Sequence, residues 1–156
     1  MSQYTSIFLQ KGETFIEVSC TSRNNALSEM FANLAPWEKI RELSKADLDA
    51  IYSEYKEDLN RWREYRKNTE ERKKLIATFN NSVEDKMEAI QECDNSIEET
   101  TETIEDLECA LARVAWFSEI IWDGAANVWV GCECGSNVTF EDDVNWKVPT
   151  DSKNED

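Results

Sequence analysis

A run of carboxylates in the second half of the chain is the largest group of residues able to do chemistry. Residues 84–108 hold eleven acids, and Lys86 is their only basic residue. Nearly every seventh residue from Leu48 to Leu111 is apolar. If this segment is helical, nine of the acids lie one, two or five positions after a residue of this repeat, and they face away from it. These nine, which we call the acidic ladder, are Glu84, Asp85, Glu88, Glu92, Glu98, Glu99, Glu102, Glu105 and Asp106.

The density of the acids suggests what they could bind. Residues 84–108 would span about 37 Å of helix, with one acid per about 3.4 Å, close to the phosphate spacing along one strand of duplex DNA. Such a surface could occupy a basic nucleic-acid channel on another protein. A solvated helix face, partly neutralised by a basic neighbour, explains the same residues and stays open as the alternative.

The composition excludes much other chemistry. The 156 residues include 33 acidic and 17 basic side chains, a net charge of −16, and no histidine. Histidine-dependent nucleophiles, bases and metal sites are therefore excluded. The four glycines form no phosphate-binding loop. The acidic balance argues against direct nucleic-acid binding, which needs a basic footprint. We expect a non-enzymatic protein without a cofactor, whose partner is a basic protein such as a nucleic-acid-binding effector.

Cysteines and aromatic residues offer two smaller candidates. Cys20, Cys132 and Cys134 could supply three thiolates to zinc. A single Cys-x-Cys lacks the usual paired knuckles, and buried free cysteine is common, so we expect no metal. Trp62 and Tyr65 lie among arginines, which is the composition of interface hot spots. Trp62 falls on the apolar repeat and is expected in a helix seam, whereas Tyr65 is the better candidate for partner binding.

A long helical hairpin must position these side chains. Ser44 and Asp47 have capping-box spacing and predict a helix start. Residues 79–82 contain turn and cap formers, which predict a tip near 80–82 and place the basic stretch 61–74 beside the acids. A break at 94–96 ranks second, and a continuous helix that dimerises ranks third. The seven-residue repeat comprises Leu48, Tyr55, Trp62, Thr69, Ile76, Val83, Ile90, Ile97, Ile104 and Leu111.

Short β-prone runs bracket the hairpin. Residues 4–9 and 14–19 predict a β-hairpin turning at Gly12, and 127–134 predict a third strand. The sequence predicts an α+β fold, with a long antiparallel coiled-coil helical hairpin on a small three- to four-stranded antiparallel sheet with one short helix. Smaller expected elements are a helix over 26–35, further helical turns over 37–43, and a fourth strand over 138–140.

We expect one compact domain with four parts. They are an N-terminal β-hairpin and short helix at 1–43, the helical hairpin at 44–122, C-terminal strands at 123–141, and an acidic flexible tail at 142–156. The N-terminus lacks a signal-peptide pattern, and no stretch approaches about 18 apolar residues. We therefore expect a cytoplasmic protein without a membrane partner.

Two segments resemble a known class of proteins in style. They are residues 6–17, Ser-Ile-Phe-Leu-Gln-Lys-Gly-Glu-Thr-Phe-Ile-Glu, and residues 79–86, Phe-Asn-Asn-Ser-Val-Glu-Asp-Lys. The class comprises short, acidic, histidine-poor proteins encoded by bacterial phages and prophages. Some of them block host defence systems such as CRISPR effectors by presenting acidic surfaces to nucleic-acid sites. The resemblance implies a DNA-mimicking inhibitor acting in a bacterial host cell. A structural coiled-coil module for oligomerisation or assembly is the alternative function.

Overall fold

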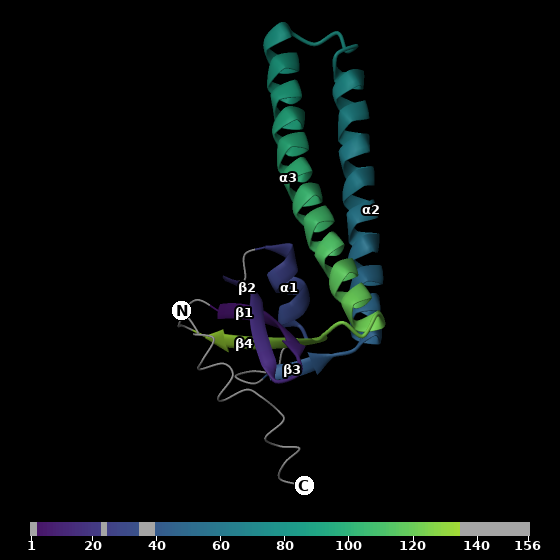
Figure 1. Ribbon diagram of the computed structural model, residues 1–156. Helices are drawn as coiled ribbons and strands as arrows, with labels where there is room; N and C mark the ends of the chain where they lie inside the picture. The colour runs from purple at the N-terminus through teal and green to yellow at the C-terminus, as the bar shows by residue number, and fades with distance from the viewer. Residues whose placement is uncertain (1–2, 23–24, 35–39, 135–156) are drawn as a thin grey trace. The chain divides into compact units, whose positions relative to one another are not determined.

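The computed structural model describes residues 3–22, 25–34 and 40–134 (Figure 1). The elements are β1 (Gln3–Lys11), β2 (Thr14–Ser22), α1 (Ala26–Ala32), β3 (Ile40–Leu43), α2 (Lys45–Ile76), α3 (Val83–Trp122) and β4 (Asn127–Cys134). This confirms the α+β class, with a helical hairpin and a small antiparallel sheet. The chain forms two compact units. The sheet unit combines Met1–Tyr52 with Ala112–Asp156, and the hairpin unit is Ser53–Leu111. The domain boundaries given above stay predictions.

The sheet joins strands from both ends of the described chain. Its order is β2-β1-β4-β3, and all neighbours are antiparallel. The β1–β2 turn contains Gly12 at φ 62°, a conformation that glycine adopts without strain. On its other edge β1 pairs with β4, so that Ile7 lies opposite Val130. β1 and β2 are longer than predicted, and β1 pairs with β4 from Gln3 to Gln10.

The expected helical turns over 37–43 are wrong in part. Residues 40–43 form β3, an edge strand that pairs with β4, with Leu43 opposite Val128. The unpaired edge of β4 offers hydrogen bonds to a neighbouring strand, and this tertiary pairing outweighs a weak local helical pattern. The predicted helix over 26–35 is shorter and covers Ala26–Ala32, where the side chain of Asn25 caps it. The predicted fourth strand over 138–140 lies outside the described residues.

Aromatic side chains form much of the core of the sheet unit. Phe8, Phe15 and Trp129 make one buried cluster, with the Phe15 and Trp129 rings 6.2 Å apart. Phe31 of α1 meets Phe117 of α3 edge-on at 5.8 Å. Both phenylalanines are fully buried. The C-terminal part of α3 therefore belongs to the core of this unit.

Capping side chains set the helix boundaries. Ser44 and Asp47 form the predicted reciprocal box: the Asp47 N–H donates to Ser44 Oγ at 3.1 Å, and the Ser44 N–H donates to Asp47 Oδ2 at 2.9 Å. Ser82 Oγ accepts from the Asp85 N–H at 3.2 Å, at the start of α3. After α3, Gly124 at φ 69° closes a Schellman-type turn, in which the Ala125 N–H donates to the Ile120 carbonyl.

The hairpin turns where the first-ranked prediction placed it. Helix α2 ends at Ile76 and α3 begins at Val83, so the connection contains residues 80–82. The alternative break at 94–96 is wrong, because α3 continues through these residues. Two of their polar side chains contact α2 instead: Asp94 pairs with Lys73, and Ser96 hydrogen-bonds Tyr65. The continuous-helix alternative is also wrong.

The seam of the hairpin unit includes buried residues on both helices. Ile104 and Leu111 of the repeat are buried and Val83 at the tip is 71% exposed. Four further residues of the repeat are half-buried: Tyr55, Ile76, Ile90 and Ile97. Thr69 and Thr100 are buried polar seam residues, and each hydroxyl donates to the carbonyl four residues earlier in its own helix. The remaining buried residues of the seam are Leu59, Cys93, Leu107 and Ala110.

Candidate protein-binding surface

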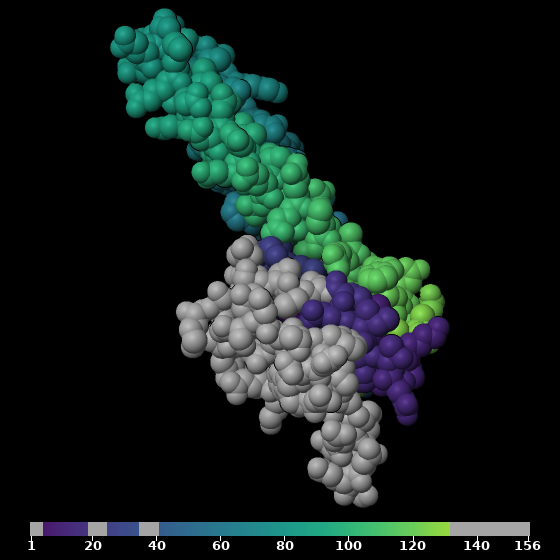
Figure 2. Space-filling model, turned by 60° about the vertical axis from the view of Figure 1, so that its left-hand side comes forward, coloured from purple at the N-terminus to yellow at the C-terminus, as the bar shows by residue number. Residues whose placement is uncertain are grey.

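All nine residues of the acidic ladder are exposed on α3. At about 100° per residue, their positions fall within a stripe about 160° wide whose centre is opposite the seam. Figure 2 shows α3 as the teal to green band in front of α2 along the hairpin. The predicted outward direction of these carboxylates is therefore the one that they have in the structure.

Two acids of the same segment lie outside the ladder, and both pair across the hairpin. Asp94 lies 2.6 Å from Lys73 Nζ, and Glu108 accepts from Arg63 at 2.8 Å. The predicted alignment of the basic stretch with the acidic one is thus confirmed at both ends. Each pair is partly exposed and is worth at most about 1 kcal/mol. Their position favours the antiparallel register, and most of the ladder lies on the opposite side of α3.

Tyr65 and Trp62 lie together in a groove between α2 and α3. Trp62 is 40% exposed and Tyr65 45%, and their rings meet edge-on at 6.0 Å. The hydroxyl of Tyr65 is 3.1 Å from Ser96 Oγ on α3. The groove has a volume of about 690 Å³. We call it the aromatic groove, and its lining is Asp58, Arg61, Trp62, Tyr65, Ser96, Glu99, Thr100 and Thr103.

The exposure of Trp62 corrects the expectation that this ring would fill the seam. The side chains opposite it are small, because Ser96, Thr100 and Thr103 are the α3 residues that line the groove beside Glu99. A large ring against small partners leaves part of its surface uncovered. The sequence also did not predict that Glu99, a ladder residue, lines the same groove as Trp62 and Tyr65. The run of small polar residues at helical spacing on α3 was the signal that could have indicated a groove.

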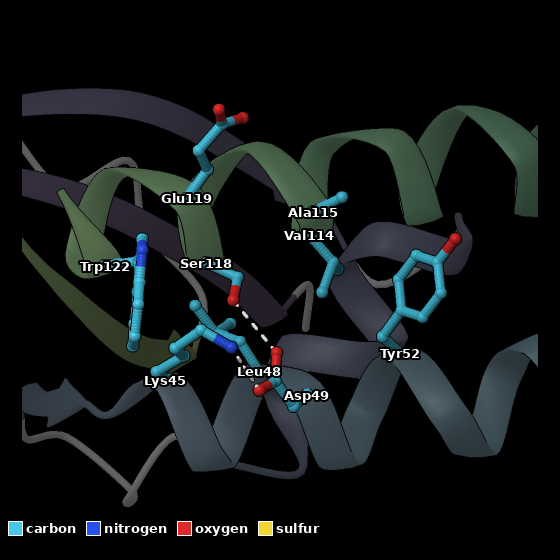
Figure 3. A pocket seen from close by; sticks show the side chains of 9 residues that line it. All are labelled: Lys45, Leu48, Asp49, Tyr52, Val114, Ala115, Ser118, Glu119 and Trp122. Carbon is cyan, nitrogen blue, oxygen red and sulfur yellow. Dashed lines mark hydrogen bonds and ion pairs between the residues drawn. The ribbon is translucent and has the colours of Figure 1, made fainter.

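A second pocket, of about 480 Å³, lies within the sheet unit between the first turns of α2 and the last turns of α3 (Figure 3). Several of its side chains interact with one another. Asp49 accepts a hydrogen bond from Ser118 Oγ at 2.9 Å and contacts Lys45 Nζ at 2.6 Å, while that amine lies 5.6 Å from the centre of the Trp122 ring. Figure 3 shows the rings of Trp122 and Tyr52 at opposite ends of the pocket, with Glu119 directed away from Asp49.

The hydrogen bonds in this pocket favour the ionised form of Asp49. The hydrogen bond from Lys45, then that from Ser118, lowers the pKa of Asp49 from its ordinary value of 3.8. A carboxyl that acts as a general acid near neutral pH needs its pKa raised, not lowered. The pocket therefore holds Asp49 as a carboxylate beside apolar walls.

Thiols and metal ligands add little among the described side chains. Cys93 is buried and Cys109 exposed, and both are free thiols. No group of three or more acidic, histidine or cysteine side chains in this part of the chain could hold a metal ion. The backbones of Cys20 and Cys132 pair with Ser6 and Thr5 of β1, but their side chains, and that of Cys134, are outside the described set. The zinc alternative at these cysteines stays a prediction.

Comparisons of the chain with protein-family models, with curated proteins and with solved structures found no match. Among the described helices, none has the length and apolar character needed to span a membrane. The charge, exposure and geometry of the hairpin surface are therefore the features from which we infer a function.

Proposed function

We propose that this chain is a non-enzymatic protein-binding protein that inhibits a basic, nucleic-acid-binding partner. The acidic ladder occupies the partner's nucleic-acid site and takes the place of a phosphate backbone. The observation that carries the proposal is that all nine ladder acids are exposed and form one outward stripe on α3, in addition to Asp94 and Glu108, which pair across the hairpin. A surface of one sign attracts and orients a partner of the opposite sign.

The arrangement of the ladder is unfavourable for a helix that needs only a solvated face. Glu84, Glu88 and Glu92 follow one another at four-residue spacing, as do Glu98, Glu102 and Asp106. Like charges at this spacing destabilise a helix, whereas alternating Glu and Lys would stabilise it. A functional surface explains a destabilising charge pattern of this length, whereas a solvated face gives no reason for it.

The resemblance to phage-encoded acidic proteins suggests the class of partner. In this proposal the partner is a host defence effector such as a CRISPR nuclease, and the chain acts in the cytoplasm of a bacterial cell. The basic channel that holds nucleic acid in such an effector is complementary in charge to the ladder. The chain itself contacts no nucleic acid.

The test is inhibition of DNA cleavage by a panel of purified, guide-loaded CRISPR nucleases. The critical variant reverses four ladder acids: Glu98→Lys, Glu99→Lys, Glu102→Lys and Glu105→Lys. The control reverses four exposed acids of α2 and makes the same change in net charge: Glu54→Lys, Glu57→Lys, Glu64→Lys and Glu71→Lys.

We expect the ladder variant to lose inhibition by about 100-fold, from roughly 0.7 kcal/mol for each reversed charge. The control should lose much less, and circular dichroism should show that both variants keep their helices. Inhibition that survives ladder reversal, or that falls equally in the control, contradicts a role for the ladder. A wild-type chain that inhibits none of the nucleases overturns the inhibitor proposal.

The tip of the hairpin favours a second candidate function. Large apolar side chains are exposed there on both helices, and exposed apolar patches mark association surfaces. They are Leu75, Phe79, Val83 and Met87. A structural oligomerisation module would use them to bind a second copy. Light scattering at varied salt separates the candidates: a salt-resistant oligomer that Val83→Asp and Met87→Asp abolish supports the module, and a monomer contradicts it.

A further inference from the structure

We infer that the aromatic groove is an anchor site for an arginine side chain of the basic partner. This inference rests on the proposed function and adds to it a specific contact that the ladder alone does not provide. A guanidinium group is planar, stacks on aromatic rings and binds carboxylates through two parallel hydrogen bonds. Trp62, Tyr65 and Glu99 place both kinds of partner in one groove.

The aromatic pair is held in place before any partner arrives. The rings of Trp62 and Tyr65 are nearly perpendicular, at 86°, so that the edge of one packs against the face of the other. The Tyr65 hydroxyl is tied to Ser96 Oγ of α3 at 3.1 Å. Even so, both side chains keep more than a third of their surface exposed. A rigid, accessible ring surface binds with little loss of side-chain entropy.

One added cation would balance the net charge of the side chains that line the groove. Its lining includes two acids, Asp58 and Glu99, and one base, Arg61, which gives a net charge of −1. Arg61 pairs with Asp58 on its own helix. Glu99 is exposed, belongs to the ladder and lies on the other wall of the groove. An incoming guanidinium would balance the charge of Glu99 while its plane rests on an aromatic ring.

Other occupants fit this groove less well. A nucleic-acid base could stack on the same rings, but its phosphates would meet the acidic ladder and be repelled. An apolar side chain would bury the polar residues Ser96, Thr100 and Thr103 that line the α3 wall. A lysine carries the right charge, but its ammonium is strongly hydrated and lacks the planar fork. The groove therefore selects arginine over lysine.

The experiment compares fluorescein-labelled hexa-arginine and hexa-lysine peptides by anisotropy on the full chain. We expect the wild type to bind hexa-arginine about fivefold more tightly, the preference expected when one guanidinium stacks on an aromatic ring. Trp62→Leu should bring this ratio close to one and leave hexa-lysine binding unchanged, while Trp62→Phe should retain most of the preference. A wild type without arginine preference, or a Trp62→Leu variant that keeps it, overturns the inference.

Two variants with the same change in charge isolate the carboxylate. Glu99→Gln lies in the groove, whereas Glu105→Gln is an exposed ladder position outside the groove lining. Glu99→Gln should weaken hexa-arginine binding severalfold more than Glu105→Gln does, and both should weaken hexa-lysine equally. Equal losses for hexa-arginine contradict the role given to Glu99.

A variant of the ladder away from the groove keeps this inference distinct from the proposed function. Glu84→Lys, Glu88→Lys and Glu92→Lys together should weaken both peptides and leave the arginine preference intact. If hexa-lysine binding is unaffected by this variant, the ladder proposal fails. If hexa-lysine binding depends on the ladder but the arginine preference does not depend on Trp62, only the arginine anchor fails.

Discussion

Glu102 is the ladder residue with the most like-charged neighbours. Glu98 and Asp106 lie four residues away on either side, and Glu99 and Glu105 lie three residues away. Side chains at these spacings are neighbours on a helix surface. We predict that Glu102→Lys makes the protein more stable than the wild type, although most substitutions destabilise proteins.

The size of the effect follows from these four neighbours. Each like-charged pair costs about 0.2–0.5 kcal/mol, and each opposite pair stabilises by a similar amount. Glu102→Gln removes four repulsions and should raise the free energy of unfolding by about 1 kcal/mol. Glu102→Lys replaces them with attractions and should raise it by about 2 kcal/mol at low ionic strength. Added salt should reduce both gains, because the Debye length falls to about 3 Å at 1 M.

Urea unfolding followed by far-ultraviolet circular dichroism measures these free energies at low and high salt. Glu108→Lys is the matched control, because Glu108 is an acid of the same helix that pairs with Arg63. It should lower stability, by at most about 1 kcal/mol. A Glu102→Lys protein no more stable than the wild type at low salt would refute the reasoning. A stabilised variant that has lost inhibition would indicate that the ladder is retained for function at a cost in stability.

Three further predictions concern the sheet unit. Ser44→Ala removes the N-cap hydroxyl of α2 and should cost about 1 kcal/mol, measured by urea unfolding; an unchanged midpoint would contradict the capping role. The backbone hydrogen bond from Ser44 is the main cause that lowers the pKa of Asp47 below 3.8, so its stabilisation is complete above that pH and is lost as the pH falls through the lowered value. Asp47→Asn should therefore flatten the acid limb of the stability profile, and an identical acid limb would refute the linkage. Phe117→Ala removes the buried ring that meets Phe31 and should cost about 3–5 kcal/mol in the same unfolding assay, whereas a loss near zero would show that the site is not a packed core.

Local signals in the sequence determined the helical hairpin and the direction of the ladder. The spacing of Ser44 and Asp47 predicted the first helix start, and the turn and cap formers at 79–82 predicted where the second helix begins. Both signals are local, because capping hydrogen bonds involve residues only three apart. The ladder acids face outward because each lies a fixed number of positions from a residue of the apolar repeat in the same helix. That spacing sets the angle between the acid and the repeat around the helix axis. Each of these features depends on neighbours along the chain, so no tertiary information was needed.

Only the tertiary structure decided features in which distant residues meet. Strand β3 forms because β4, more than eighty residues later in the chain, offers an edge to pair with. Trp62 is exposed because the α3 residues opposite it are small, and Glu99 reaches the same groove only through the register of the hairpin. A repeat assigns a residue to one face of its own helix but carries no information about the size of the side chains facing it, and that size decides whether a seam is filled or open.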